Sequence, residues 1–133
     1  MMTTGLDTSV VLRLITGEPE EQSQVARRWL TEWLRSGRTA KVSDLVVAEA
    51  YHALRYHYGM SKKDALAGLL RMFLSRTVLP AGQAAKVLLQ NGLPSARPGF
   101  VDRLIHAAYT DPNGNMVTFE KSGKTLERAI VLT

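Results

Sequence analysis

The sequence contains no cysteine among its 133 residues, which excludes disulfides, thiolate metal sites and cysteine nucleophiles. It also has no apolar run long enough to span a bilayer. The first four residues, Met1-Met2-Thr3-Thr4, lack the basic and apolar regions of a secretory signal. These absences lead us to expect a cytoplasmic protein with no membrane partner.

Several motifs that bind nucleotides or metals are also missing. Neither a GxxxxGK[ST] phosphate loop nor a GxGxxG dinucleotide fingerprint occurs. The three histidines do not have HExxH spacing, and His52 and His57 lie five residues apart, so they do not share a helix face. A zinc site is therefore not expected. Ser9 stands two residues after Asp7, where aspartyl-phosphate chemistry would require a second aspartate.

The positive charge is unevenly distributed. The formal net charge is +5 at pH 7, and residues 61–133 hold ten basic residues against five acidic ones, whereas residues 1–60 hold seven of each. A basic half favours a polyanionic partner, because phosphate neutralisation supplies most non-specific affinity for nucleic acid. A merely soluble basic surface would carry the same charge. The length predicts one domain spanning residues 1–133.

Helical and strand patterns alternate along the chain. A first short strand ends before Asp7, and the other predicted strands are Thr39–Val42, Thr77–Leu79, Met116–Phe119 and Ala129–Leu132. The predicted helices are Ser9–Leu14, Glu20–Arg35, Asp44–Tyr58, Ser61–Ser75, Gly82–Asn91 and Phe100–Thr110. This alternation predicts an α/β fold, with a short central parallel sheet flanked by helices on both faces. Trp29 and Trp33 are expected in the core, with a partner groove as the alternative.

Four carboxylates occupy unusual positions in this pattern. Asp7 and Glu120 stand at strand ends, where ligands bind in open α/β sheets. Asp102 lies in the first turn of its helix, and Glu49 is the only charge in an otherwise apolar helical segment. Each has an ordinary explanation too: Asp7 as an N-cap, Asp102 as a partner of the helix dipole, and Glu49 on an exposed stripe beside His52.

Together these carboxylates suit Mg²⁺ or Mn²⁺, since both ions prefer oxygen ligands. Such a site activates water and stabilises an in-line phosphoryl displacement. We therefore predict a metal site formed by Asp7, Glu49, Asp102 and Glu120. We expect Ser9 and Thr118 to hydrogen-bond around it, and Arg103, Lys121 and Lys124 to bind RNA.

The same residues carry a family resemblance. Leu6-Asp7-Thr8-Ser9-Val10 resembles the opening of a PIN domain, and the segments around Glu49, Asp102 and Glu120 resemble its second, third and fourth acidic motifs. Their order and spacing are similar to those of small PIN-domain ribonucleases of the VapC type, the toxins of type II toxin–antitoxin pairs. The resemblance implies a PIN-like three-layer sandwich and a Mg²⁺- or Mn²⁺-dependent endoribonuclease. It also implies a homodimer that holds a small antitoxin in a hydrophobic groove.

Two positions depart from the family pattern. The fourth acid is usually aspartate, whereas Glu120 is one methylene longer, and Arg103 follows Asp102 where a small residue is common. One alternative is therefore a catalytically degraded PIN-like domain that binds RNA or protein. Another is a metal-dependent nuclease that acts on DNA or flap structures.

Overall fold

Hydrogen-bonding side chains define where three of the helices begin. In the computed structural model, which describes residues 2–133, Asp7, Ser43 and Ser61 each accept a hydrogen bond from the backbone amide three residues further on. Such N-caps satisfy amides that have no partner within the helix. The helices that follow are α1 (Thr8–Thr16), α3 (Asp44–Tyr56) and α4 (Lys62–Leu74).

The predicted bounds of α2 (Glu20–Arg35) and β2 (Thr39–Val42) are confirmed. The remaining elements are β1 (Thr3–Gly5), β3 (Leu79–Pro80), α5 (Ala84–Leu88), η1 (Leu93–Ser95), α6 (Phe100–Thr110), β4 (Met116–Thr118), η2 (Lys121–Thr125) and β5 (Ala129–Val131). Within residues 2–133, none of the helices has the length and apolar character needed to cross a membrane.

The third strand was predicted two residues too early. The sequence favours Thr77–Leu79, whereas β3 pairs Leu79 with Lys41 and Pro80 with Val42. Pro80 is tolerated because β3 lies at the sheet edge. The position of β3 is therefore determined by its pairing with β2 rather than by local strand propensity.

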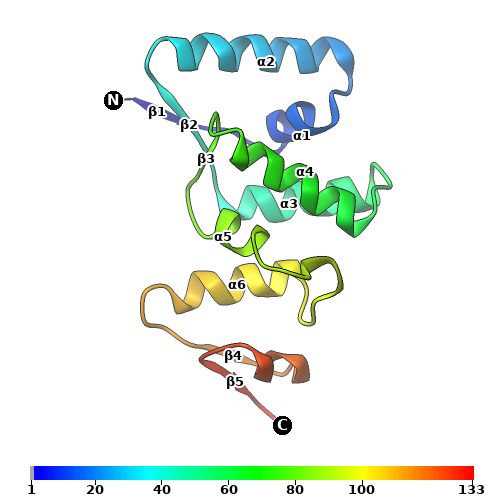
Figure 1. Ribbon diagram of the computed structural model, residues 1–133, viewed down its shortest axis with the longest axis vertical. Helices are drawn as coiled ribbons and strands as arrows, with labels where there is room; N and C mark the ends of the chain where they lie inside the picture. Colours follow the sequence, from blue (N-terminus) through cyan, green and yellow to red (C-terminus); the bar gives the residue numbers. More distant parts are fainter. Residues whose placement is uncertain (1) are drawn as a thin grey trace.

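The main sheet has the order β1-β2-β3, and all three strands are parallel. Helix α1 lies between α2 and the pair α3 and α4 (Figure 1). Its buried valine Val11 joins Val42 of β2, Val47 of α3 and Leu69 of α4 in one core, and each of these side chains is fully buried. The predicted α/β class, with a short parallel sheet flanked by helices, is confirmed.

The last quarter of the chain forms a separate group of elements, α6, β4, η2 and β5, which we call the C-terminal unit (residues 100–133). Among the described residues 2–133, its strands β4 and β5 pair only with each other, in a second parallel sheet. The C-terminal unit lies at the opposite end of an elongated molecule from α2 (Figure 1). The sequence predicts one sheet, whereas the structure divides the strands between two.

Helix α5 connects the C-terminal unit to the rest of the molecule. The Asp44 carboxylate at the start of α3 accepts hydrogen bonds from the amides of Gln83 and Ala84, both at 3.0 Å. Gly82 allows this close approach, because a Cβ there would lie 2.5 Å from the Asp44 carboxylate. Asp44 therefore fixes α5 on α3, and α5 in turn packs against α6.

Candidate functional site

Asp7 follows β1 and starts α1, so its carboxylate lies at the carboxyl end of the main sheet. Its Oδ1 accepts hydrogen bonds from Ser9 Oγ at 2.7 Å and from the Val10 amide at 3.3 Å. The Ser9 hydroxyl, and then the Val10 amide, lower the pKa of Asp7 below its ordinary value of 3.8. This exposed side chain is therefore ionised at neutral pH, and both hydrogen bonds are accepted by Oδ1.

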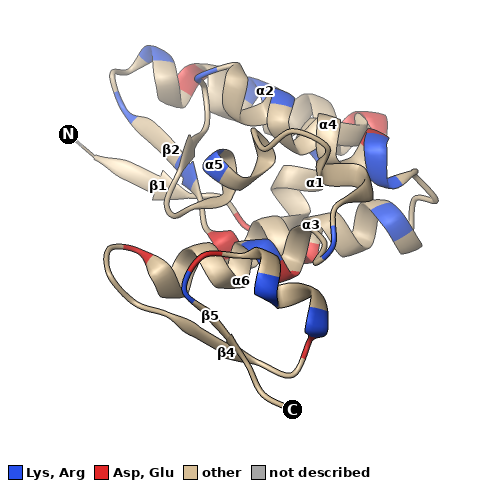
Figure 2. Ribbon diagram, turned by 60° about the horizontal axis from the view of Figure 1, so that its bottom comes forward, with Lys and Arg blue, Asp and Glu red and all other residues tan. Residues whose placement is uncertain are grey.

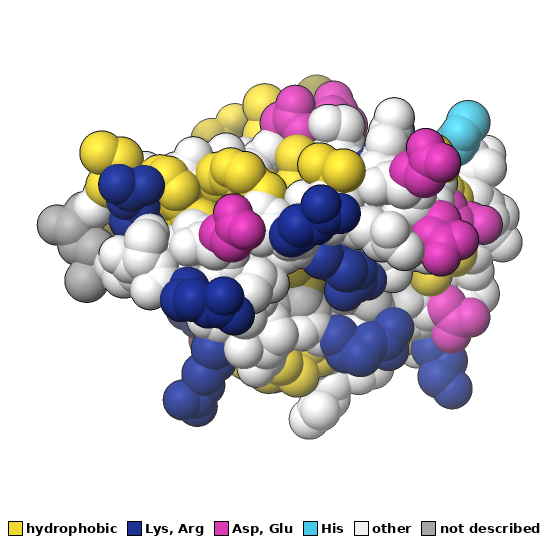
Figure 3. Space-filling view, turned by 90° about the horizontal axis from the view of Figure 1, so that it is seen from above, with side chains coloured by type: hydrophobic (Ala, Val, Ile, Leu, Met, Phe, Trp, Pro, Cys, Tyr) yellow, Lys and Arg dark blue, Asp and Glu magenta, His cyan; other side chains and the backbone are white. Residues whose placement is uncertain are grey.

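A groove of about 610 Å³ runs beside β1 and Asp7. Its apolar lining comes from the residue after β1, from α1 and from α2: Leu6, Val10, Val25, Ala26 and Trp29. Trp29 is 44% exposed and stacks on half-buried Trp33, with ring centroids 5.1 Å apart. The expectation that Trp29 belongs to the core is therefore wrong. Viewed from the α2 side, hydrophobic side chains form a row bordered by both basic and acidic side chains (Figure 3).

Asp102 and Glu120 are brought together in the C-terminal unit. Both line a pocket of about 420 Å³, to which Arg97 and Lys121 contribute cationic side chains. The Oε1 atom of Glu120 accepts a hydrogen bond from Ser122 Oγ at 3.2 Å. Acidic and basic positions lie near one another along the ribbon around α6 (Figure 2). The pocket therefore combines two carboxylates with two positively charged groups.

Glu49 lies on an exposed stripe of α3. Leu45 and Tyr56, on the same stripe, are 80% and 75% exposed, and His52 stacks on Tyr56 with ring centroids 5.9 Å apart. The helix is therefore buried on one face only, through Val47 and neighbouring core residues. The structure agrees with the alternative interpretation, in which Glu49 lies on an exposed stripe beside His52.

The four predicted ligands do not meet within one chain. Asp7 lies in the groove beside β1, Glu49 lies on the surface of α3, and Asp102 and Glu120 share the pocket of the C-terminal unit. Among residues 2–133, no three or more His, Asp or Glu side chains form a group that could hold a metal ion. A metal site shared by all four stays a prediction.

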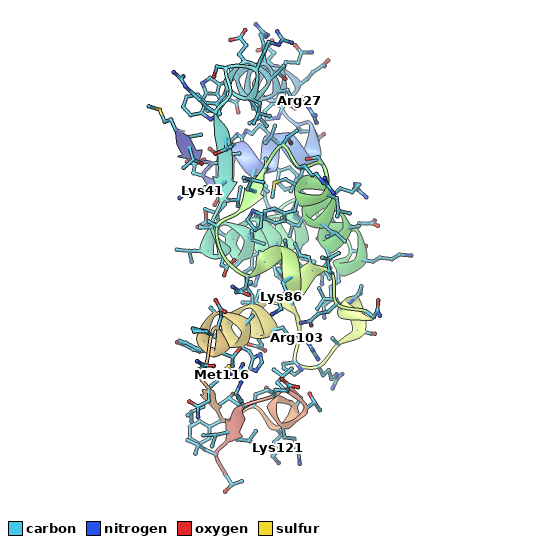
Figure 4. The ribbon with its side chains drawn as sticks, turned by 60° about the vertical axis from the view of Figure 1, so that its left-hand side comes forward. Arg27, Lys41, Lys86, Arg103, Met116 and Lys121 are labelled. Atoms are coloured by element: carbon cyan, nitrogen blue, oxygen red, sulfur yellow. The ribbon has the colours of Figure 1, made fainter. Side chains whose placement is uncertain are left out.

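The predicted RNA-binding residues occupy different surroundings. Arg103 donates from Nε to Pro98 O at 2.7 Å and from Nη2 to Arg97 O at 3.3 Å, so it holds the loop that precedes α6 (Figure 4). Lys121 and Lys124 are exposed on η2. The two lysines are thus accessible to a polyanion, whereas the guanidinium of Arg103 already has partners.

The two predicted hydroxyl residues also differ. Ser9 donates a hydrogen bond directly to the Asp7 carboxylate, and this contact can orient it. Thr118 Oγ1 accepts from the Glu120 amide at 3.0 Å, so it caps the local backbone. Ser122, which the sequence analysis missed, makes with Glu120 the contact that Ser9 makes with Asp7. The shared spacing, an acid followed two residues later by serine, is visible in the sequence.

Comparisons with known proteins add little to this description. No family model matches the sequence, and no curated protein matches it. The fold is similar to a chain in a crystal structure of VapBC2 from Rickettsia felis bound to a DNA fragment from their promoter. The identity is 20%, the TM-score is 0.41, and 98% of each chain is covered.

Proposed function

We propose that this protein is a Mg²⁺- or Mn²⁺-dependent endoribonuclease of the PIN-domain type. The observation that carries the proposal is the pocket in which Asp102 and Glu120 lie beside Lys121 and Arg97. A phosphodiesterase needs both kinds of charge, because carboxylates hold the divalent cation and basic groups hold the phosphate. The strand-end carboxylate Asp7 and the basic C-terminal half support the same reading.

The donor chemistry fits a hard divalent cation. Asp7, Glu49, Asp102 and Glu120 would supply only carboxylate oxygens, which Mg²⁺ and Mn²⁺ prefer. When bound, the cation neutralises phosphate charge and lowers the pKa of the attacking water.

The surrounding side chains of the chain have separate roles. Ser9 and Ser122 would orient the carboxylates to which they donate, since such contacts fix ligand geometry. Lys121 and Arg97 would hold the backbone phosphate of the RNA, and Lys124 would extend this basic surface.

The activity can be tested by incubating RNA with the protein in Mg²⁺, in Mn²⁺ or in chelator. We expect divalent-dependent cleavage that falls more than about 100-fold in Asp102→Asn, since loss even of an indirect partner of a ligand costs 10- to 100-fold. Asp64→Asn is a matched control, because Asp64 also lies in the first turn of a helix but belongs to no candidate site. Equal activity in chelator, or an equal loss in both variants, would contradict the assignment.

A second candidate is a PIN-like module that binds RNA or protein without cleaving it. The observation that favours it is the separation of Asp7 and Glu49 from the pocket in one chain. RNA binding that persists in chelator, without cleavage under any divalent cation, would favour this candidate.

We further propose that the protein is the toxin of a toxin–antitoxin pair, acts as a homodimer and binds a small antitoxin in a hydrophobic groove. The support is the order of the four acidic motifs along the chain. Induced expression of the wild type should arrest growth, and Asp102→Asn should not. Co-expression of the product of a short neighbouring reading frame should restore growth. Equal growth of wild type and variant would contradict the toxin role.

A further inference from the structure

Strand β1 has an open edge. It pairs with β2 on one side, and no strand within residues 2–133 pairs with its other side. An open edge presents unpaired N–H and C=O groups, which form a template for a further strand. The apolar groove with Val25 and Trp29 of α2 lies beside this edge. A strand added there would be covered on one face by α2.

Strand β4 also has an open edge. It pairs with β5 alone, and an isolated two-stranded sheet is at best marginally stable. A narrow groove beside β4 is lined by Ile105 and Tyr109 of α6, which are 45% and 61% exposed. A strand added to β4 would therefore be covered on one face by α6.

One face of the small sheet is apolar and uncovered. Val117 and Ile130 are paired neighbours, and Phe119 and Leu132 follow two residues later on the same face, because strand side chains alternate. Their exposed fractions are 56%, 47%, 74% and 44%. Met116, on the opposite face, is buried between β4 and α6 (Figure 4). An apolar sheet face without cover marks an interaction surface.

The two open edges match in length. β1 and β4 are both three residues long and belong to parallel sheets. If Thr3–Gly5 pairs with Met116–Thr118, Thr4 lies beside Val117, and Asp7 lies beside Glu120. Thr4 lines the α2 groove, so the uncovered face of the small sheet would turn toward α2. Helix α6 would then cover the opposite face.

We propose that two copies of this chain exchange their C-terminal units, so that β4 of each copy pairs with β1 of the other. The result is a five-stranded parallel sheet of order β5-β4-β1-β2-β3 in each half of a dimer. Because the exchange is reciprocal, the assembly is a closed dimer. In it, β1 and β4 each have a paired strand on both sides.

We expect the strand that pairs with β1 to come from a second copy, because contacts within the chain hold its own C-terminal unit away from β1. Phe100 at the start of α6 packs edge-to-face on Tyr51 of α3, with ring centroids 5.2 Å apart. Arg103 binds the loop before α6. Asp44 holds the start of α5, and α5 packs against α6. Closure within one chain would break these contacts, whereas exchange between two copies keeps them.

The area available is sufficient for a stable dimer. Six apolar side chains would lose their exposed parts in each half: Val25, Trp29, Val117, Phe119, Ile130 and Leu132. At roughly 100 Å² each, both halves bury on the order of 1,200 Å² before the strand edges and α6 are counted. Stable interfaces begin at about this size.

The exchange also completes the candidate metal site, and this part rests on the proposed nuclease function. Asp102 and Glu120 of the partner subunit would stand at the carboxyl end of β1, beside Asp7. Each site would then combine carboxylates from two chains, although neither chain gathers them alone.

The absence of cysteine allows a direct test of the strand pairing, since introduced cysteines are the only thiols. Paired Cα atoms on neighbouring strands lie within the range that a disulfide spans. A Thr4→Cys chain mixed with a Val117→Cys chain should form a disulfide-linked heterodimer on mild oxidation. Absence of this product would overturn the exchange. An intrachain disulfide in the double variant, without the mixed product, would show closure within one chain instead.

The oligomeric state provides an independent test. By light scattering, the wild type should have about twice its mass of 14.7 kDa, and Phe119→Asp should be monomeric. Leu89→Asp is the control, because Leu89 is 60% exposed but lies on neither open edge. A monomeric wild type, or a dimer that Phe119→Asp leaves intact, would overturn the proposal.

Complementation links the exchange to activity. Asp7→Asn and Asp102→Asn chains should each be inactive alone, whereas their mixture regains about a quarter of wild-type activity, because half of the dimers contain one intact site of two. No recovery from a mixture that does form heterodimers would overturn the composite site. If the wild type does not cleave RNA but the Thr4→Cys and Val117→Cys chains still form the mixed disulfide, the proposed function is refuted and the exchange stands.

Discussion

Asp44 offers the sharpest test of how this fold is held together. Its two carboxylate oxygens accept the amides of Gln83 and Ala84, about forty residues away in the chain, in a half-buried position. Hydrogen bonds to a charged group contribute about 1.5–3 kcal/mol each. We discount this for partial exposure and expect Asp44→Ala to lower the free energy of unfolding by about 3 kcal/mol.

For a chain of 133 residues this loss corresponds to a fall of about 10 °C in melting temperature. Asp44→Asn keeps one acceptor oxygen and should lose about half as much. Thermal unfolding followed by circular dichroism measures both variants.

Asp64→Ala is the matched control, because Asp64 also stands in the first turn of a helix but its carboxylate is exposed. It should lose only the interaction with the helix dipole, about 0.3–1 kcal/mol. Equal losses at the two positions would show that Asp44 acts through the helix dipole and not through α5. The same result would refute the reasoning that α5 is fixed by Asp44.

Three further outcomes are expected. Arg103→Ala should lower the melting temperature yet leave the salt dependence of RNA binding unchanged, whereas a fall of about one unit in the salt slope would mean that Arg103 contacts phosphate. The pKa of Asp7 lies below its ordinary value, so its hydrogen bonds stabilise the fold above about pH 4, and this contribution is lost as the pH falls through the lowered pKa. Ser9→Ala should raise the pKa of Asp7, measured by NMR titration, and an unchanged pKa would contradict the role of the Ser9 hydroxyl. Mn²⁺ at 100 times its dissociation constant should stabilise the wild type by about 2.7 kcal/mol and Asp102→Asn by less, and equal shifts in melting temperature would place the ion elsewhere.

The local structure could be predicted from the sequence because its signals are local. Ser43 and Ser61 stand directly before helical patterns, which is typical of N-caps, and each accepts an N-cap hydrogen bond in the structure. The helix predicted over Gly82–Asn91 is shorter in the structure, where α5 spans Ala84–Leu88 and Leu89–Asn91 lead into η1. End positions were therefore less accurate than start positions.

Long-range arrangement could not be predicted in the same way. Whether Met116–Thr118 pairs with β1 or with β5 depends on contacts made far along the chain, and short apolar strands carry little information about their neighbours. The four candidate acids could be found because each stands at a distinctive position on a predicted helix or at the end of a predicted strand. Whether they meet depends on that pairing. The sequence patterns therefore predict one shared site, whereas in the structure of a single chain the acids lie apart.

The position of the two tryptophans, the only ones in the chain, has a practical consequence. Trp33 has fixed surroundings, since its Nε1 donates to Thr39 O at 2.7 Å and the Arg38 guanidinium lies 4.7 Å from its ring centroid. Trp29, one turn earlier, is open to water at the groove beside β1. In a Trp33→Phe variant, Trp29 would be the sole indole emitter. Its emission should move to shorter wavelength whenever the groove is covered, so this protein can report the occupancy of its own groove by fluorescence without any attached dye.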